Sequence, residues 1–201
     1  MSAAKLNSRI KRLTSQLPKE SATVLKHGFN ESQRDKISSI ILLASAEFEY
    51  FLEQCVLKRI ESSYNLWRKK RQPTQTMLAI FHAGHPARRK TVIGGVNEEF
   101  NKPYSQAIEQ AYRNVRKLVD DNNGINEDDT KALLTCIGVD VASLNIEITI
   151  LSNFTRSRGA IAHLPDGKHK VIMTQSTNVV KSELVQSLKA LECIARTVRS
   201  V

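Results

Sequence analysis

Apolar residues recur at intervals of three and four along most of the chain, which is the period of amphipathic helices. The longest example runs from about residue 32 to residue 62, and Asn30 or Ser32 can cap its start. Two neighbouring stripes cover most of its circumference: Ile37, Ile41, Ala44, Phe48, Phe51 and Cys55 form one, and Leu42, Ser45, Glu49, Leu52 and Val56 form the other. A helix that is apolar on most sides is expected at the centre of the fold.

The same periodicity predicts helices at about 103–122, 126–137, 141–164 and 180–198, with a brief extended segment at 168–173. A short basic helix with Leu6, Ile10 and Leu13 on one face is expected before Pro18. The fold class is therefore predicted as all-α, a bundle of about four to six helices. At 201 residues the chain suits one domain, 31–201, preceded by an N-terminal basic helix or arm at 1–30.

Residues 63–102 interrupt the helical pattern. Pro73, Gly84, Pro86 and the pair Gly94-Gly95 make a long helix improbable here, apart from a turn at 76–82. Long loops inside compact domains are usually functional or disordered. The segment is therefore predicted to be a long loop inserted between core helices.

The insertion is also strongly basic. The chain has a net charge of +10, and residues 62–97 contain no acidic residue but seven basic ones: Arg68, Lys69, Lys70, Arg71, Arg88, Arg89 and Lys90. Such a polarised segment is expected to attract a polyanion. Tyr64, Trp67 and Phe81 lie among these cations, and aromatic side chains can stack on unpaired bases. RNA contact is the functional hypothesis, and a solvated loop anchored by a buried tryptophan is the alternative.

Metal, redox and membrane roles find little support in the sequence. Cys55, Cys136 and Cys193 are odd in number and lie in apolar helical stretches, which favours reduced core thiols. His82 and His85 have no third ligand nearby, so no metal and no cofactor are expected. No apolar run approaches the roughly 18 residues of a membrane span, and the N-terminus lacks a signal-peptide pattern. We expect a cytoplasmic protein.

The stretch from 144 to 165 combines an apolar stripe with two chemically useful side chains. Arg158 falls on the stripe formed by Leu144, Ile148, Leu151, Thr155 and Ala162, where a guanidinium needs a partner or a role. His163 lies about 140° further round the helix, and Pro165 ends it. The two side chains are therefore expected at one helix end, on adjoining faces.

Arg158-Gly-Ala-Ile-Ala-His163 resembles the Arg-x4-6-His signature of HEPN domains, and the flanking sequence is similar to their ribonuclease subset. The resemblance covers roughly residues 35–200 apart from 62–102. It implies a helical bundle, metal-independent RNA cleavage by Arg158 and His163, and a cleft shared by two protomers of a homodimer. It also implies an acidic residue on the central helix near the pair, for which Glu49 is the candidate and Glu47 and Glu53 the alternatives. The sequence departs from the usual polar residue after the arginine, because Gly159 stands there.

Histidine and arginine are suitable residue types for this reaction. An imidazole with a pKa of about 6.5 can give and take protons near neutrality, and a guanidinium holds two phosphate oxygens in a planar fork. Cleavage requires both a general acid and a general base, so a second histidine from a dimer partner is expected. Arg156 lies on nearly the same face as His163 and is a second phosphate contact or an alternative to Arg158.

Two functions remain open on the sequence. The first is a HEPN endoribonuclease, the toxin or effector of a prokaryotic defence or toxin-antitoxin system, with RNA as substrate and an antitoxin or regulatory protein as partner. The second is a non-catalytic basic HEPN module that binds nucleic acid or assembles a complex. In that reading Arg158 pairs with Glu49, and His163 donates to a carbonyl at the helix end.

Overall fold

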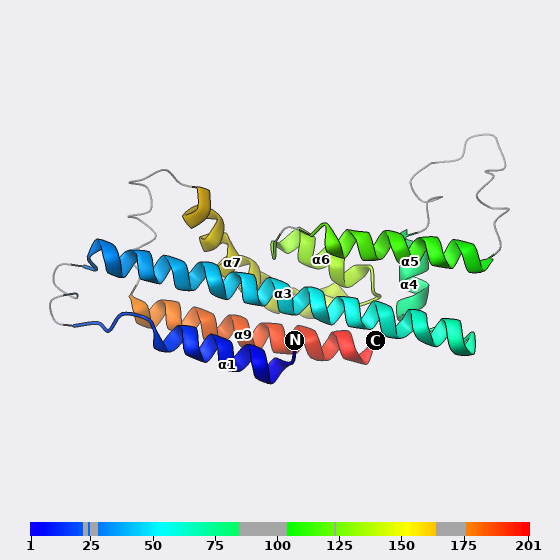
Figure 1. Ribbon diagram of the computed structural model, residues 1–201, viewed down its shortest axis with the longest axis horizontal. Coiled ribbons are helices and arrows are strands. Elements are labelled where there is room, and N and C mark those ends of the chain that lie inside the picture. The colour runs from blue at the N-terminus through cyan, green and yellow to red at the C-terminus, as the bar shows by residue number, and fades with distance from the viewer. Residues whose placement is uncertain (22–23, 25–27, 85–103, 123, 164–175) are drawn as a thin grey trace. The chain divides into compact units, whose positions relative to one another are not determined.

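The described residues of the computed structural model are mostly helical and form no strand (Figure 1). They are 1–21, 24, 28–84, 104–122, 124–163 and 176–201, and over 157–160 and 162–163 only the backbone is described. The α-helices are α1 (Ala3–Ser15), α3 (Glu31–Lys70), α4 (Gln75–Gly84), α5 (Tyr104–Asp120), α6 (Glu127–Thr135), α7 (Asn145–His163) and α9 (Thr177–Ser200), and a 3-10 turn, η3 (Val141–Leu144), precedes α7. The all-α prediction is confirmed.

The chain divides into two compact units. Unit 1 comprises Met1–Leu52, Gly124–Glu127 and Asn145–Ile194, and unit 2 comprises Glu53–Asn123, Asp128–Leu144 and Ala195–Val201. Each unit has its own buried side chains, drawn from segments that are far apart in the sequence. Unit 1 contains the predicted Arg158–His163 motif, and unit 2 contains the predicted basic cluster at 68–71.

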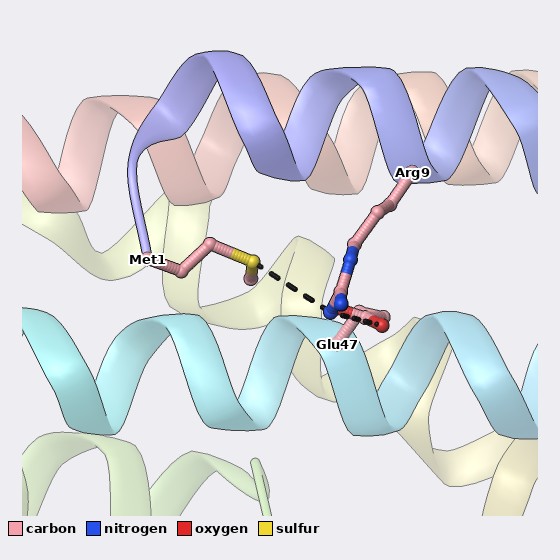
Figure 2. A network of polar contacts seen from close by, with 3 residues as sticks. All are labelled: Met1, Arg9 and Glu47. Carbon is pink, nitrogen blue, oxygen red and sulfur yellow. Dashed lines mark hydrogen bonds and ion pairs between the residues drawn. The ribbon is translucent and has the colours of Figure 1, made fainter.

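In unit 1, α1 lies against α3 and is tied to it by one ion pair. The predicted apolar face of α1 is buried, with Leu6 fully inaccessible. On another face, Nη1 of Arg9 lies 2.7 Å from both carboxylate oxygens of Glu47 on α3 and 3.9 Å from Sδ of Met1 (Figure 2). The Ser2 hydroxyl caps the helix by accepting from the backbone N–H of Lys5. The division into an arm at 1–30 and a domain at 31–201 stays a prediction.

A second polar contact in unit 1 caps α9. Glu20, which follows α1, accepts hydrogen bonds from the hydroxyls of Ser176 and Thr177 and from the backbone N–H of Asn178. A carboxylate is favourable here because the free N–H groups at a helix start give that end a partial positive charge. These hydrogen bonds lower the pKa of Glu20 below its usual range.

In unit 2, α3 and α5 run antiparallel in a constant register. Three contacts define it: Glu53 accepts from Asn122, Glu61 pairs with Arg116, and the ring of Tyr64 stacks on that of Tyr112. As the α3 position advances along the chain, its partner on α5 moves back by a similar number of residues. The C-terminal turns of α3 are therefore paired with the N-terminal half of α5.

The helices α4 and α5 approach each other closely at one glycine. A Cβ added at Gly84 would lie 2.8 Å from Cα of Ala111, which is closer than real Cβ atoms come. The amide of Asn114 donates to the carbonyl of Gly84 at 2.7 Å, so the approach also satisfies a carbonyl at the end of α4. Glycine at 84 thus permits the contact between these two helices.

The predicted loop at 63–102 is wrong for two of its parts. Helix α3 continues beyond Ser62 to Lys70, and residues 75–84 form α4. The continuation has a physical reason: residues 63–70 contain no glycine or proline, arginine and lysine are good helix formers, and Tyr64 packs against α5. The helix ends where Arg71 adopts the left-handed conformation, with a φ of 53°, two residues before Pro73. Residues 85–103, with Arg88, Arg89 and Lys90, lie outside the described residues.

Candidate functional site

Helix α7 is anchored by the apolar stripe that the sequence predicts. Leu144, Ile148 and Leu151 are buried. Thr155, next on the stripe, is half-buried, and its hydroxyl lies 2.5 Å from the carbonyl oxygen of Ile125. These contacts hold the first half of α7 in place within unit 1. The second half of the helix, which contains the motif, continues directly from it.

An aromatic contact between Phe48 on α3 and Phe154 on α7 lies one turn before the motif. Their ring centroids are 5.6 Å apart and the ring planes meet at 65°, an edge-to-face arrangement that aromatic pairs favour. Both side chains are buried. The contact places the α3 turn that contains Glu49 beside the α7 turn that precedes Arg158.

Position 158 falls on the buried side of α7. Seen along the helix axis, it lies about 20° from Leu151 and about 40° from Phe154, at 100° per residue. Ile161, three residues further, is also buried, with 8% of its surface exposed. Buried neighbours therefore lie both before and after Arg158 on this face, although its own side chain is outside the described residues.

His163 is the last residue of α7, as the sequence predicts for the end of the motif helix. Its position lies about 180° from Phe154, and Arg156 lies about 20° from His163 on the same side. Arg156 is exposed. The helix thus separates the two candidate arginines, because Arg156 shares the face of His163 and Arg158 does not.

Glu49 has the surroundings that the sequence predicts. It is half-buried on α3, and Ser45, Leu52 and Val56 on the same face are buried. The two alternative carboxylates have other contacts: Glu47 pairs with Arg9, and Glu53 accepts from Asn122. The pairing of Glu49 with Arg158 stays a prediction.

Comparison with known proteins identifies the family. Residues 4–194 match the RiboL-PSP-HEPN family. The chain belongs to this family. A search of curated proteins and a search of solved structures each gave no match. The resemblance to HEPN domains is confirmed, and its extent is larger than predicted, because the HEPN match begins before α3 and includes α1. Membership points to a nucleic-acid-related role for the chain.

The second group of predicted site residues lies in unit 2 of this HEPN protein. Arg68, Lys69, Lys70 and Arg71 are all exposed at the C-terminal end of α3. The guanidinium carbon of Arg68 lies 5.9 Å from the ring centre of Tyr64, and that of Arg71 lies 5.8 Å from the ring centre of Trp67. Cations are favourable at this end because the free carbonyls of a helix C-terminus are partially negative.

Sequence reasoning missed the contribution of α5 to this surface. Tyr112 stacks on Tyr64 with 4.0 Å between ring centres and 13° between planes. Arg116 donates to the Tyr112 hydroxyl at 3.2 Å, and Arg113 pairs with Glu109 at 2.6 Å. The available signal was the face shared by Tyr112 and Arg116, four residues apart, but nothing in the sequence gives the register of α5 against α3.

The structure also bears on the cysteines, on metal binding and on membrane insertion. Cys136 is buried, and burial raises the pKa of its thiol to about 12, so this thiol is a poor nucleophile. Burial also raises the pKa of Cys55, and all three cysteines are free. Within the described ranges, histidine, cysteine and carboxylate side chains do not gather in threes that could hold a metal. No helix of the described part is long and apolar enough to cross a membrane.

Proposed function

We propose that this HEPN protein is a metal-independent endoribonuclease in which Arg158 and His163 carry out the reaction. The observation that carries the proposal is the course of α7, which remains helical through the whole motif to His163. This regular backbone fixes the two residues about 140° apart round the helix and within about two turns of each other. Family membership over residues 4–194 supports the same role.

The reaction needs only proton transfers and charge stabilisation. One histidine takes the proton of a ribose 2′-hydroxyl, whose oxygen attacks the adjacent phosphorus. The bond from phosphorus to the 5′-oxygen breaks, and that oxygen receives a proton from an acid. The products are a 2′,3′-cyclic phosphate and a free 5′-hydroxyl. Arginine stabilises the negative charge that develops on the phosphorane oxygens.

A homodimer would supply both the acid and the base. One chain has one His163, and a second protomer would contribute another if the two α7 helices approach the same phosphate.

Such a nuclease fits the role of a toxin or effector in prokaryotic defence or a toxin-antitoxin system. Uncontrolled cleavage of RNA would harm the cell that makes it, so a neutralising antitoxin or regulatory protein is part of the proposal. RNA in the cytoplasm is the proposed substrate.

A non-catalytic RNA-binding module is the second candidate, and one observation favours it. Leu151, Phe154 and Ile161, on the side of α7 where position 158 falls, are buried, and an arginine paired with Glu49 on that side would serve structure alone. In this alternative the exposed basic residues of α3 bind RNA and no bond is cleaved.

Cleavage in excess EDTA separates the two candidates. Purified protein incubated with end-labelled RNA should give fragments with 2′,3′-cyclic phosphate ends, and His163→Ala should give none. RNA containing 2′-deoxyribose at the cleaved positions should resist, because the attacking oxygen is absent. Intact RNA after incubation with the wild-type dimer, or equal cleavage by His163→Ala, would favour the binding module.

A further inference from the structure

The end of α3 combines exposed cations with aromatic rings at helical spacing. Arg68 lies over Tyr64 and Arg71 lies over Trp67, each guanidinium four residues after its ring. Lys69 and Lys70 are exposed between them. Between Lys58 and Arg71 the chain has six basic residues and one acidic residue, Glu61. This surface therefore combines positive charge with aromatic rings and planar guanidinium groups.

Helix α5 adds an aromatic ring and an arginine to those of α3. The ring of Tyr112 lies nearly parallel to that of Tyr64, and Arg116 approaches the Tyr112 hydroxyl. Glu61 lies 3.6 Å from Arg116, so the single acidic residue of this stretch of α3 is directed to α5. We call Tyr64, Trp67, Arg68, Arg71 and Tyr112 the ring–arginine platform.

The backbone conformation of Arg71 is a second, independent sign that this surface binds a ligand. Arg71 has a φ of 53°, and its N–H donates to the carbonyl of Trp67 at 2.8 Å, closing the helix in the way that glycine usually does. A residue with a side chain costs about 1 kcal/mol or more in this conformation. The chain thus places a cation over Trp67 at a position where glycine would be more stable, and non-glycine residues in such conformations concentrate at binding sites.

We propose that the ring–arginine platform binds unpaired nucleotides of single-stranded RNA. Phosphates would contact Lys69 and Lys70, and bases would stack on the indole of Trp67, on Tyr112 and on the guanidinium planes. Stacking on aromatic rings and arginines accepts any base whose face is open. A duplex hides its base faces within its own stack, so it would meet only the charges. The inference rests on the proposed function for the choice of RNA, but it does not require His163.

The single tryptophan of the chain makes a direct test possible. A base that stacks on Trp67 should quench its fluorescence. Short single-stranded RNA with 2′-O-methyl riboses is bound but not cleaved, since its attacking oxygen is blocked. We expect saturable quenching by this strand and none by its duplex, even where the duplex binds. Quenching of equal depth by the duplex or by inorganic polyphosphate would overturn the proposal, as would binding of the single strand without quenching, or no binding.

Two variants separate stacking from charge. Tyr112→Leu should weaken single-strand binding about 5- to 150-fold, the range for one stacked base, and leave duplex binding unchanged. Lys69→Ala with Lys70→Ala should weaken both, and should lower the slope of log affinity against log salt for the single strand by about 1.4. Equal loss of single-strand and duplex binding in Tyr112→Leu would show that the ring serves only the fold.

The outcomes for the platform and for the nuclease are distinguishable. Quenching by the blocked strand without cleavage of ordinary RNA in EDTA would retain the platform and remove the nuclease. Cleavage without quenching would retain the nuclease and remove the platform.

Discussion

The ring of Phe154 on α7 meets the ring of Phe48 on α3 edge to face, 5.6 Å between centres, one helical turn before Arg158. Both rings are buried, so this pair holds α7 against α3 within unit 1 shortly before the motif. We expect the position of the candidate catalytic residues to depend on it.

Loss of this aromatic pair should lower stability by a measurable amount. Phe154→Leu and Phe48→Leu each keep an apolar side chain, and a double-mutant cycle should give a coupling free energy of about 0.5–1.5 kcal/mol. Denaturant unfolding measures it. Leu78→Ala, at a side chain that is 57% exposed in unit 2, is the control and should change the free energy of unfolding by less than about 0.5 kcal/mol. Coupling near zero would mean that the rings do not hold α7.

We expect Arg158 and Arg156 of α7 to have different roles, the first in catalysis and the second in RNA binding. Arg158→Ala should reduce cleavage by about 10²–10³-fold, the usual loss for one donor to the developing charge. Arg156→Ala, at the exposed position, should weaken RNA binding and its salt dependence while most of the rate at saturating RNA remains. Single-turnover rates and binding constants measured for both variants decide the question. The reverse pattern would assign the catalytic role to Arg156, which shares the face of His163.

Glu49→Gln tests the proposed orientation of Arg158. The amide keeps the shape of the carboxylate but loses its charge, so cleavage should fall while the thermal midpoint changes little. Glu47→Gln is the matched control two residues away, because it removes the charge that pairs with Arg9 and leaves Glu49 unchanged. A loss of cleavage in both variants, or in neither, would contradict a specific role for Glu49.

Arg71→Gly should stabilise the protein and weaken its RNA binding. Relief of the left-handed strain is expected to contribute about 1 kcal/mol, which raises the thermal midpoint by about 2–4 °C in a chain of this size. The same change removes the cation over Trp67. Calorimetry and RNA titration on one sample measure both effects. An unchanged affinity for RNA would show that Arg71 is only a helix terminator.

The cap formed by Glu20 should make stability depend on acidity. The folded pKa of Glu20 lies below its ordinary value of 4.5, because hydroxyl and N–H groups at the start of α9 bond to the carboxylate. Its contribution is therefore present above that value and is lost as the pH falls through the folded pKa. Wild type should melt at a higher temperature than Glu20→Gln at pH 7, with the difference shrinking in acid. Glu192→Gln, in the middle of α9, should show no such convergence.

The sequence predicts the helices and the motif better than it predicts their contacts. Periodicity places α7, α9 and the start of α3 within a few residues, because their buried side chains recur at helical spacing, but it ends α3 eight residues too early. The stripe from Leu144 to Thr155 and the surroundings of Glu49 follow for the same reason. The pattern predicts the end of α3 at about residue 62, but residues 63–70 contain no glycine or proline and Tyr64 packs on Tyr112, and that pairing depends on a register that no local pattern encodes. Charge indicated Arg68 to Arg71, and the sequence also shows Tyr64 and Trp67 beside them, whereas the contribution of Tyr112 on α5 required the fold.

Gly84 has a consequence for how the α4–α5 pair can vary. The atoms that a Cβ at this position would meet belong to the backbone of Ala111 and not to its side chain. A second substitution at 111 therefore cannot make room, since every residue has the same backbone. Related chains should keep glycine at this point whatever they place around it, and a mutational library of this helix pair can vary its other positions but should hold this one constant.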